Sequence, residues 1–269
     1  MNTSRYNVPA LDRGLKLLQL FDRSQTQLSA PEISRRLGIP RSTVFRLIQT
    51  LESLGFLERT DTIYRLGPAV LRLGFEYIAS LEVTDLGRPI LEKLRDDTGM
   101  PCQIAIRDGR EIAIALRVSA PSAFSSNIHV GTRMPAHATV LGRLFLTDLT
   151  EDELARLFPE HTLPAHSPQT PRTLPDLARL LREDRQRGYA ISEAFFEASI
   201  SAIAAPIRDA SGRVIAAISL TVLQPRIEPQ DLRDRLVSQV LAAAAELSER
   251  LNYRPMKRPV ADRSERAVA

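Results

Sequence analysis

The chain has 269 residues, 43% of them hydrophobic and 25% charged, so it holds enough apolar material for a core and is long enough for two domains. No apolar run is long enough to span a bilayer, and the first residues lack the apolar stretch of a signal peptide. The single cysteine, Cys102, excludes an intrachain disulfide. We therefore expect a cytoplasmic protein with no membrane partner.

The charge is distributed unevenly along the chain. Residues 5–66 hold ten Lys or Arg and six Asp or Glu, a balance of +4, and the segment from Arg254 onward has a balance of +3. Because the net charge of the whole chain is +4, the part between them sums to −3. A basic head on a mildly acidic body indicates a polyanion-binding module joined to a different domain.

Helical signals open the chain. Between residues 8 and 22, apolar side chains recur at helical spacing and predict a first helix, with the stripe Leu11, Leu15, Leu18 and Phe21. Ser29-Ala30-Pro31-Glu32 then matches a capping box, with proline in the first turn where its missing N–H costs nothing. Gly38 ends this short second helix and begins a tight turn.

A third helix is predicted from about Arg41 to Gly55. Its apolar face would pack on the first two helices through Val44, Leu47, Ile48, Leu51 and Leu54. The opposite face carries Ser42, Phe45, Arg46 and Gln49, and Arg41 and Thr43 lie at the N-terminal end of the helix. Their guanidinium, hydroxyl and amide groups can reach phosphates and base edges, and the Phe45 ring would contact a thymine methyl or pack beneath a wing. Two short strands, 56–59 and 63–66, predict a hairpin wing that carries Arg59 and Arg65.

A polar outer face is also what a solvated three-helix bundle presents. Here five elements follow in the order helix, capped short helix, glycine turn, polar-faced helix and basic hairpin, which favours DNA binding. We predict a winged helix-turn-helix over residues 5–66 that binds a double-stranded DNA operator. A winged helix that binds protein in place of DNA is the alternative.

Three segments of this region resemble the DNA-binding domain of the IclR family of transcriptional regulators. They are Val8-Pro9-Ala10-Leu11-Asp12-Arg13-Gly14-Leu15, Gly38-Ile39-Pro40-Arg41-Ser42-Thr43-Val44-Phe45-Arg46-Leu47 and Leu54-Gly55-Phe56-Leu57. The resemblance implies a DNA-binding regulator.

The next segment, 67–83, predicts a connecting helix that is too apolar for a free linker, because Leu71, Leu73, Phe75, Ile78 and Leu81 follow at close spacing. It would pack against another subunit or on its own domain. Beyond it, hairpin turns at Asp108-Gly109 and Ser211-Gly212 separate strand-like runs. Residues 253–269 are polar and charged, so we expect a disordered tail.

Residues 84–252 predict an α+β domain with a largely antiparallel sheet. The expected strands are 104–106, 112–116, 126–130, 189–194, 200–207 and 214–222. The expected helices are 84–98, 138–149, 150–158, 173–187 and 230–251.

The IclR resemblance continues through this domain, to about residue 250. Gly131-Thr132-Arg133-Met134-Pro135-Ala136-His137-Ala138-Thr139, followed by Gly142-Arg143, is similar to one family signature. Gly188-Tyr189-Ala190, Glu197, Ile203-Ala204-Ala205-Pro206-Ile207 and Ala216-Ala217-Ile218-Ser219 are similar to a second. The resemblance implies a GAF-like effector-binding domain in a homodimer or homotetramer, with RNA polymerase as a further partner if the protein activates transcription.

By family position, the effector pocket would draw on Thr139, Val140, Leu141, Ser192, Ala202, Ser219 and Thr221. Backbone N–H groups at the start of the helix after Thr139 suit a carboxylate, and Arg133 is a candidate counter-ion. The opposing interpretation is that hydroxyls within strands are simply tolerated there and that an exposed arginine is structural.

The effector is predicted to be a small organic acid, and an aromatic one is favoured. Val140 and Leu141 are bulky where regulators of two- or three-carbon acids have small residues, and Ser199 stands where the family often has glycine. The run 127–136 resembles the branch that regulates aromatic-acid and β-ketoadipate catabolism. The protein would then control a catabolic operon; regulation of glyoxylate- or pyruvate-type metabolism is the alternative.

Catalytic motifs are missing from the sequence. There is no nucleophile elbow, phosphate loop or CxxC motif, and His137, His161 and His166 lack zinc-site spacing. We therefore predict no enzymatic activity, no cofactor and no metal. A carboxylate-processing enzyme with an appended winged helix is the less favoured reading.

Overall fold

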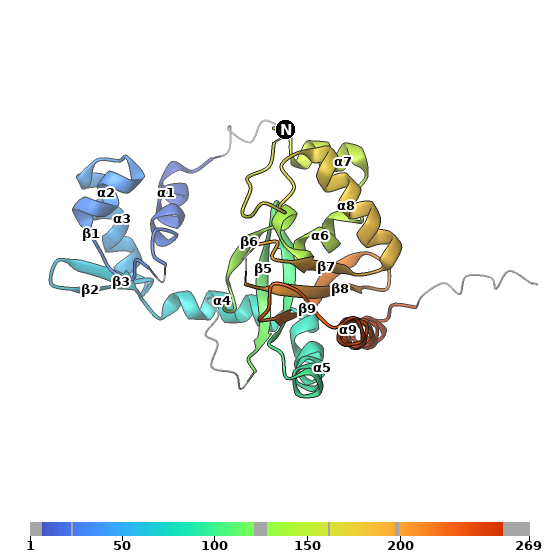
Figure 1. Ribbon diagram of the computed structural model, residues 1–269. Helices are drawn as coiled ribbons and strands as arrows, with labels where there is room; N and C mark the ends of the chain where they lie inside the picture. The colour runs from blue at the N-terminus through green and yellow to red at the C-terminus, as the bar shows by residue number, and fades with distance from the viewer. Residues whose placement is uncertain (1–6, 23, 121–127, 161, 197–198, 255–269) are drawn as a thin grey trace, which may run out of the picture. The chain divides into compact units, whose positions relative to one another are not determined.

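The computed structural model describes residues 7–22, 24–120, 128–160, 162–196 and 199–254. The chain divides into two compact units, Met1–Ser80 and Leu81–Ala269, and each unit is described by itself (Figure 1). Within the described residues, no helix is both long enough and apolar enough to cross a membrane. The tail predicted over 253–269 lies almost entirely outside the described residues.

The N-terminal unit is a helix-turn-helix followed by a hairpin. Its elements are α1 (Pro9–Leu18), β1 (Leu28–Ser29), α2 (Ala30–Leu37), α3 (Arg41–Ser53), β2 (Leu57–Thr60), β3 (Ile63–Leu66) and α4 (Ala69–Ala79). The three strands form a small antiparallel sheet in the order β1-β3-β2. A cluster that includes Leu17, Ile33 and Ile48 forms the core between the helices and the sheet.

Local signals set the boundaries of the helix-turn-helix as expected. The carboxylate of Glu32 accepts from the Ser29 N–H at 2.8 Å, which completes the capping box of α2. Gly38, at φ +64°, ends α2, and Gly55, at φ +75°, follows α3. Glycine adopts this left-handed conformation without the steric penalty that a Cβ atom imposes.

The first helix differs from its prediction in length and in its buried face. It ends at Leu18, and its buried residues are Gly14 and Leu17. Leu11 and Leu15, part of the predicted stripe, are 61% and 53% exposed. The packed face of α1 runs through Gly14 and Leu17 instead, and a Cβ atom added at Gly14 would meet a methyl of Leu47 at an ordinary contact distance of 3.9 Å.

The C-terminal unit is built on a six-stranded sheet in the order β6-β5-β4-β9-β8-β7, with every neighbouring pair antiparallel. The strands are β4 (Cys102–Asp108), β5 (Glu111–Val118), β6 (Arg133–Pro135), β7 (Ala190–Glu193), β8 (Ser201–Arg208) and β9 (Val214–Val222). The helices are α5 (Glu82–Thr98), η2 (Ala136–Ala138), α6 (Val140–Leu146), α7 (Glu151–Leu157), α8 (Leu174–Arg187) and α9 (Gln230–Arg250). The predicted α+β class with an antiparallel sheet is confirmed.

The two faces of this sheet carry separate cores. One face packs against α5 and α9 through residues such as Leu91 and Leu247. The other packs against α6 and α8, with Leu141 and Leu177 among its buried side chains. Figure 1 shows the two sets of helices on opposite sides of the sheet. The side chains of a strand alternate between these cores.

Two predicted elements of this unit are wrong. The strand expected over 126–130 begins outside the described residues, and the described part, 128–130, is not a strand; the edge of the sheet is Arg133–Pro135 instead. The helix expected over 138–149 is shorter, since η2 leads into α6 only at Val140. Gly131, at φ +87°, turns the chain before the edge strand, and Thr139 caps the helix.

A close approach fixes the start of α6. A Cβ atom added at Gly142 would lie 2.2 Å from the carbonyl oxygen of Ala136. Gly74, inside α4, has nothing within 4 Å of the same position. We expect Gly142→Ala to lower the free energy of unfolding by about 1–3 kcal/mol through overpacking. Gly74→Ala should be neutral or stabilising, because alanine is the better helix former.

Urea unfolding followed by circular dichroism measures both variants against the wild-type chain. An unchanged unfolding midpoint for Gly142→Ala would show that η2 and α6 are not held in contact at this point.

Candidate DNA-binding face and effector pocket

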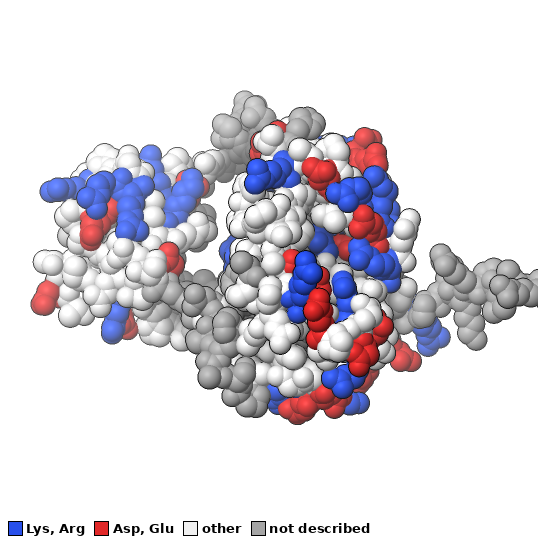
Figure 2. Space-filling view, in the orientation of Figure 1, with Lys and Arg blue, Asp and Glu red and all other residues white. Residues whose placement is uncertain are grey.

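Helix α3 presents the polar face predicted for DNA recognition. Val44 and Ile48 are buried under it. Arg41, Ser42, Arg46 and Gln49 are exposed, Thr43 is half-buried, and Phe45 is 51% exposed. Basic side chains gather over the helices of this unit in Figure 2, whereas acidic and basic side chains alternate on the other unit. Ser42, Phe45, Arg46 and Gln49 are therefore accessible along α3, and Arg41 and Thr43 lie at its N-terminal end.

The two arginines predicted for the wing, Arg59 and Arg65, lie on opposite faces of the hairpin. Arg65 lies opposite Glu58 in the β2–β3 ladder and pairs with its carboxylate at 2.7 Å. Arg59 lies opposite Tyr64, so its side chain is on the other face of the hairpin. Arg59 is exposed and forms no ion pair within the described part of the chain.

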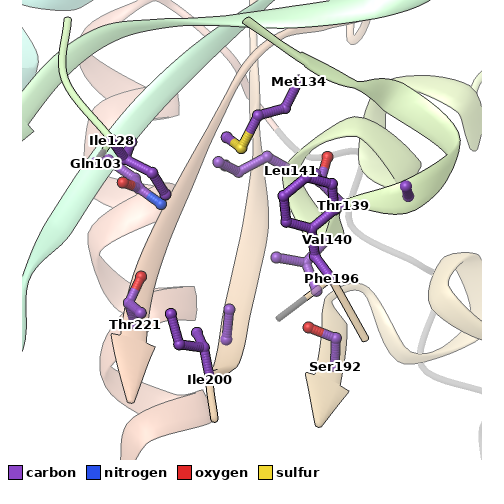
Figure 3. A pocket seen from close by; sticks show the side chains of 12 residues that line it. Gln103, Ile128, Met134, Thr139, Val140, Leu141, Ser192, Phe196, Ile200 and Thr221 are labelled. Carbon is purple, nitrogen blue, oxygen red and sulfur yellow. The ribbon is translucent and has the colours of Figure 1, made fainter. Parts of the chain in front are cut away.

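A pocket opens on the sheet face that α6 covers (Figure 3). Its cavity volume is about 60 Å³. Strands β4, β6, β7, β8 and β9, the start of α6 and adjoining loops supply its lining, which is Gln103, Ile128, Met134, Ala138, Thr139, Val140, Leu141, Ser192, Phe196, Ile200, Ala202 and Thr221. The lining is mostly apolar, with a few polar groups among hydrocarbon and aromatic side chains.

Strand register brings three of the predicted residues into one row. Ser192 on β7 lies opposite Ala202 on β8, which lies opposite Thr221 on β9. Neighbours in such a row on one face of a sheet stand about 5 Å apart. Together with Thr139, Val140 and Leu141, they make six of the eight predicted effector residues part of the pocket wall.

The other two predicted residues lie elsewhere. Arg133 is on the edge strand β6, where its guanidinium pairs with Asp108 at 2.7 Å and Glu111 at 2.8 Å. Ser219 shares the sheet face with Thr221 but is 0% exposed and does not line the pocket. Its hydroxyl has no hydrogen-bond partner within the described residues. Such a buried orphan polar atom usually marks a place for water or a ligand group.

Half of the pocket wall was not predicted from the sequence. The missed residues are Gln103, Ile128, Met134, Ala138, Phe196 and Ile200. One of them carried a usable signal: Gln103 is a polar side chain inside the apolar run Cys102–Ile106. The others are apolar residues that look like ordinary core positions until the register of the sheet is known.

The polar groups of the wall are available in different degrees. Thr139 caps α6, and its hydroxyl accepts the Gly142 N–H at 3.0 Å. Gln103, Ser192 and Thr221 make no side-chain hydrogen bond to any described residue. Their amide and hydroxyl groups are therefore free to bind a ligand.

A buried ion pair between Arg143 and Asp184 links elements that supply part of the pocket wall. Arg143 on α6 is 2% exposed, and its Nε donates to the carboxylate of Asp184 on α8 at 2.8 Å. A second guanidinium nitrogen donates to the carbonyl of Ile191 on β7 at 2.9 Å. Burial raises the pKa of Asp184, against the effect of the neighbouring guanidinium, and lowers that of Arg143. The pair ties two helices to the strand that supplies Ser192.

The segment after β7 is held by the same network. The Arg143 guanidinium lies 4.9 Å from the ring centroid of Phe195. The carbonyl of Phe195 accepts hydrogen bonds from Ser167 at 2.5 Å and from Thr170 at 3.0 Å. The adjacent Phe196 ring lines the pocket and stacks on His166 with ring centroids 4.9 Å apart.

The remaining candidate ligating groups have structural partners. Buried His137 has its Nε2 2.9 Å from the carbonyl of Pro164, and burial lowers its pKa. Burial raises the pKa of the Cys102 thiol to about 12, which keeps it protonated. His161 lies outside the described residues. Within the part of the chain that the structure describes, no cluster of three His, Cys, Asp or Glu residues could hold a metal ion.

A winged helix-turn-helix joined to a sheet domain with a small-molecule pocket defines a transcription regulator with a DNA-binding and an effector domain. Residues 10–61 match the IclR helix-turn-helix domain, and residues 75–249 match the C-terminal domain of the bacterial transcriptional regulator IclR. The chain belongs to the IclR family, which confirms the resemblance. It is a transcriptional regulator and not an enzyme.

Curated relatives span nearly the whole chain. The Pca regulon regulatory protein of Pseudomonas putida is 30% identical over 90% of this chain and 84% of its own length. The transcriptional repressor AllR of Klebsiella pneumoniae is 32% identical, with 91% of both chains covered. The regulator XynR of Escherichia coli is 29% identical over 91% of this chain and 98% of its own.

Solved structures show the same fold. A transcriptional regulator from Rhodococcus sp. RHA1 has a TM-score of 0.80 at 29% identity and covers 91% of this chain and 99% of its own. An IclR homologue from Microbacterium hydrocarbonoxydans, solved in complex with 4-hydroxybenzoate, has a TM-score of 0.79 at 27% identity. It covers 90% of this chain and 99% of its own.

Removal of the buried carboxylate should destabilise the effector unit strongly. Asp184→Asn leaves the Arg143 cation buried without its counter-charge, so we expect a loss of about 3–5 kcal/mol in the free energy of unfolding. Glu246→Gln, which breaks an exposed pair with Arg250 at 2.6 Å, serves as the control and should cost less than about 1 kcal/mol. Equal losses in urea unfolding would remove the special role of the buried pair.

Proposed function

We propose that this protein is a ligand-responsive regulator of a catabolic operon. It binds its operator through the exposed face of α3 and the wing, and it binds a small organic acid in the pocket beneath α6. The observation that carries the proposal is the pocket itself: an apolar wall in which Gln103, Ser192 and Thr221 keep unused polar groups. Such a wall suits a compact molecule with one apolar body and a few polar substituents.

A single-ring aromatic acid is the proposed effector class. Val140, Leu141, Met134 and the Phe196 ring offer flat apolar contacts (Figure 3). Apolar contact contributes roughly 25 cal/mol per Å², so an apolar wall favours an acid with an apolar body over a two- or three-carbon acid. Two relatives support the choice: one is named for the Pca regulon, and another was solved with 4-hydroxybenzoate.

We further propose that the working molecule contains two or four copies of the chain. Helix α4 carries Leu71, Leu73, Phe75 and Tyr77, which are 56–75% exposed in the single chain. An exposed apolar stretch of this kind supports burial against a second copy. Two copies would present two recognition helices, as a palindromic operator requires.

Operator binding should depend on the exposed arginines of α3. Arg46→Ala should weaken binding, and loss of one phosphate contact should lower the slope of log affinity against log salt by about 0.9. The Arg41→Ala, Arg46→Ala double variant should lose its footprint. Arg179→Ala, an exposed arginine on α8, is the matched control and should bind as the wild type does. An unchanged footprint for the double variant would contradict the assignment of α3.

Effector binding should stabilise the protein. An acid present at 100 times its dissociation constant should raise the free energy of unfolding by about 2.7 kcal/mol. A thermal-shift series with benzoate, 4-hydroxybenzoate, 3,4-dihydroxybenzoate, pyruvate and glyoxylate measures this. Stabilisation by pyruvate or glyoxylate, with none from the benzoates, would support the alternative effector class in place of the aromatic one.

A further inference from the structure

Three polar side chains gather at one end of the pocket. Gln103 on β4 lies directly opposite Ser219 on β9, and Thr221 follows two residues later on the same face of β9. Residues opposite each other across two strands stand about 5 Å apart at their bases, and diagonal neighbours about 7–8 Å, within reach of a glutamine side chain. In Figure 3 the amide of Gln103 and the hydroxyl of Thr221 lie on the same side of the pocket. We call Gln103, Ser219 and Thr221 the polar end.

The polar end is buried and has no hydrogen-bond partner among the described residues. Gln103 and Thr221 are 7% and 8% exposed, and Ser219 is 0% exposed. The Ser219 Oγ is enclosed without a partner, and the side chains of Gln103 and Thr221 line the cavity without a hydrogen bond to any described residue. Because buried polar groups in folded proteins almost always have partners, unpaired groups beside a cavity indicate a place for water or a ligand group.

The chemistry of the polar end favours a hydroxyl over a carboxylate. Amide and hydroxyl groups each donate and accept hydrogen bonds, as a phenolic hydroxyl does, whereas a carboxylate only accepts them. A carboxylate also carries a charge, which is costly to bury without a counter-charge. No cationic side chain lines the pocket among its described residues, and Arg117, opposite Gln103 on β5, already has an interaction partner and does not line it. An uncharged substituent therefore suits this end.

We propose that the Gln103 side chain recognises a ring hydroxyl of the effector, with the Thr221 hydroxyl as the second partner. The inference rests on the aromatic acid proposed above and gives its orientation. The hydroxyl points to the polar end, and the carboxylate lies toward Ser192, two strands away from Thr221 and across the pocket in Figure 3. Ser192, Phe196 and Ile200 are half-buried, so a carboxylate on that side keeps contact with water. The amide accepts from the phenolic O–H through Oε1 or donates to its oxygen through Nε2.

Gln103 is placed where it can set ligand choice without disturbing the fold. Its strand neighbours Cys102 and Ile104 pack in the core beneath α5 and α9, while Gln103 itself lines the pocket. Methionine at this position has nearly the same length but no amide, and such volume-conserving changes leave packing largely intact. A site that hydrogen-bonds a ligand hydroxyl discriminates against an analogue that lacks it. The Gln103→Met variant therefore isolates the hydrogen bond from the packing.

The test compares a ring hydroxyl with a methyl group of similar size on the full-length protein. The probes are 3- and 4-hydroxybenzoate, each paired with the methylbenzoate substituted at the same position, measured by titration calorimetry. Wild-type protein should bind one hydroxy acid at least about tenfold more tightly than its methyl partner, and Gln103→Met should reduce this ratio to about twofold or less by weakening only the hydroxy acid. Thr221→Val should reduce the ratio in part. Gln239→Met on α9, outside the pocket, is the matched control and should keep the wild-type ratio.

The methylbenzoates also report folding, because a variant that binds them as the wild type does has an intact pocket. An unchanged ratio for Gln103→Met, or loss of the methylbenzoates together with the hydroxy acids, would overturn the role of Gln103 and leave the aromatic-acid effector in place. Wild-type protein that binds each methylbenzoate as tightly as its hydroxy partner would overturn it too, and water alone would then occupy the polar end. Failure of all four acids to bind wild-type protein would remove both this role and the aromatic-acid effector, while DNA binding by α3 is judged separately from its footprint.

Discussion

The effector unit depends on the buried pair between Arg143 and Asp184. A charge pair shielded from water is favourable only when the remaining hydrogen-bond donors also find partners. Here the carbonyl of Ile191 and the ring of Phe195 complete the surroundings of the guanidinium. One side chain thus joins α6, α8, β7 and the segment behind it. The pair therefore links the parts of the pocket wall that come from α6 and β7.

The DNA-binding unit was predictable because its signals are local. The Ser29–Glu32 capping box, the Gly38 turn and the apolar spacing of α3 each act over a few residues and need no tertiary information. The first helix shows the limit of such signals. Leucine spacing pointed to the stripe containing Leu11 and Leu15, yet the buried residues are Gly14 and Leu17, because the face that packs is set by contact with the rest of the unit and not by helical spacing alone.

The pocket was predictable only in part, for a physical reason. Ser192, Ala202 and Thr221 are distant in sequence and were placed by resemblance to a family, not by periodicity; the ladder then puts them in one row. Phe196 and Met134 carry no local sign that they face a cavity and not a core. Strand β5 shows a further limit of sequence patterns. Ala115 is an extra residue in its ladder, so Ile114 and Leu116 lie on opposite faces of the sheet, although simple alternation would put them on the same face.

Consecutive residues of the central strands serve opposite sides of the sheet. On β4, Cys102 and Ile104 belong to the core beneath α5 and α9, while Gln103 between them faces the ligand side. A substitution at Gln103 or at another position that faces the pocket can alter which ligand is bound while the core beneath α5 and α9 keeps its packing. In a sheet built this way, single substitutions on the ligand side can change which molecule is bound without first requiring extra stability from the core on the other side.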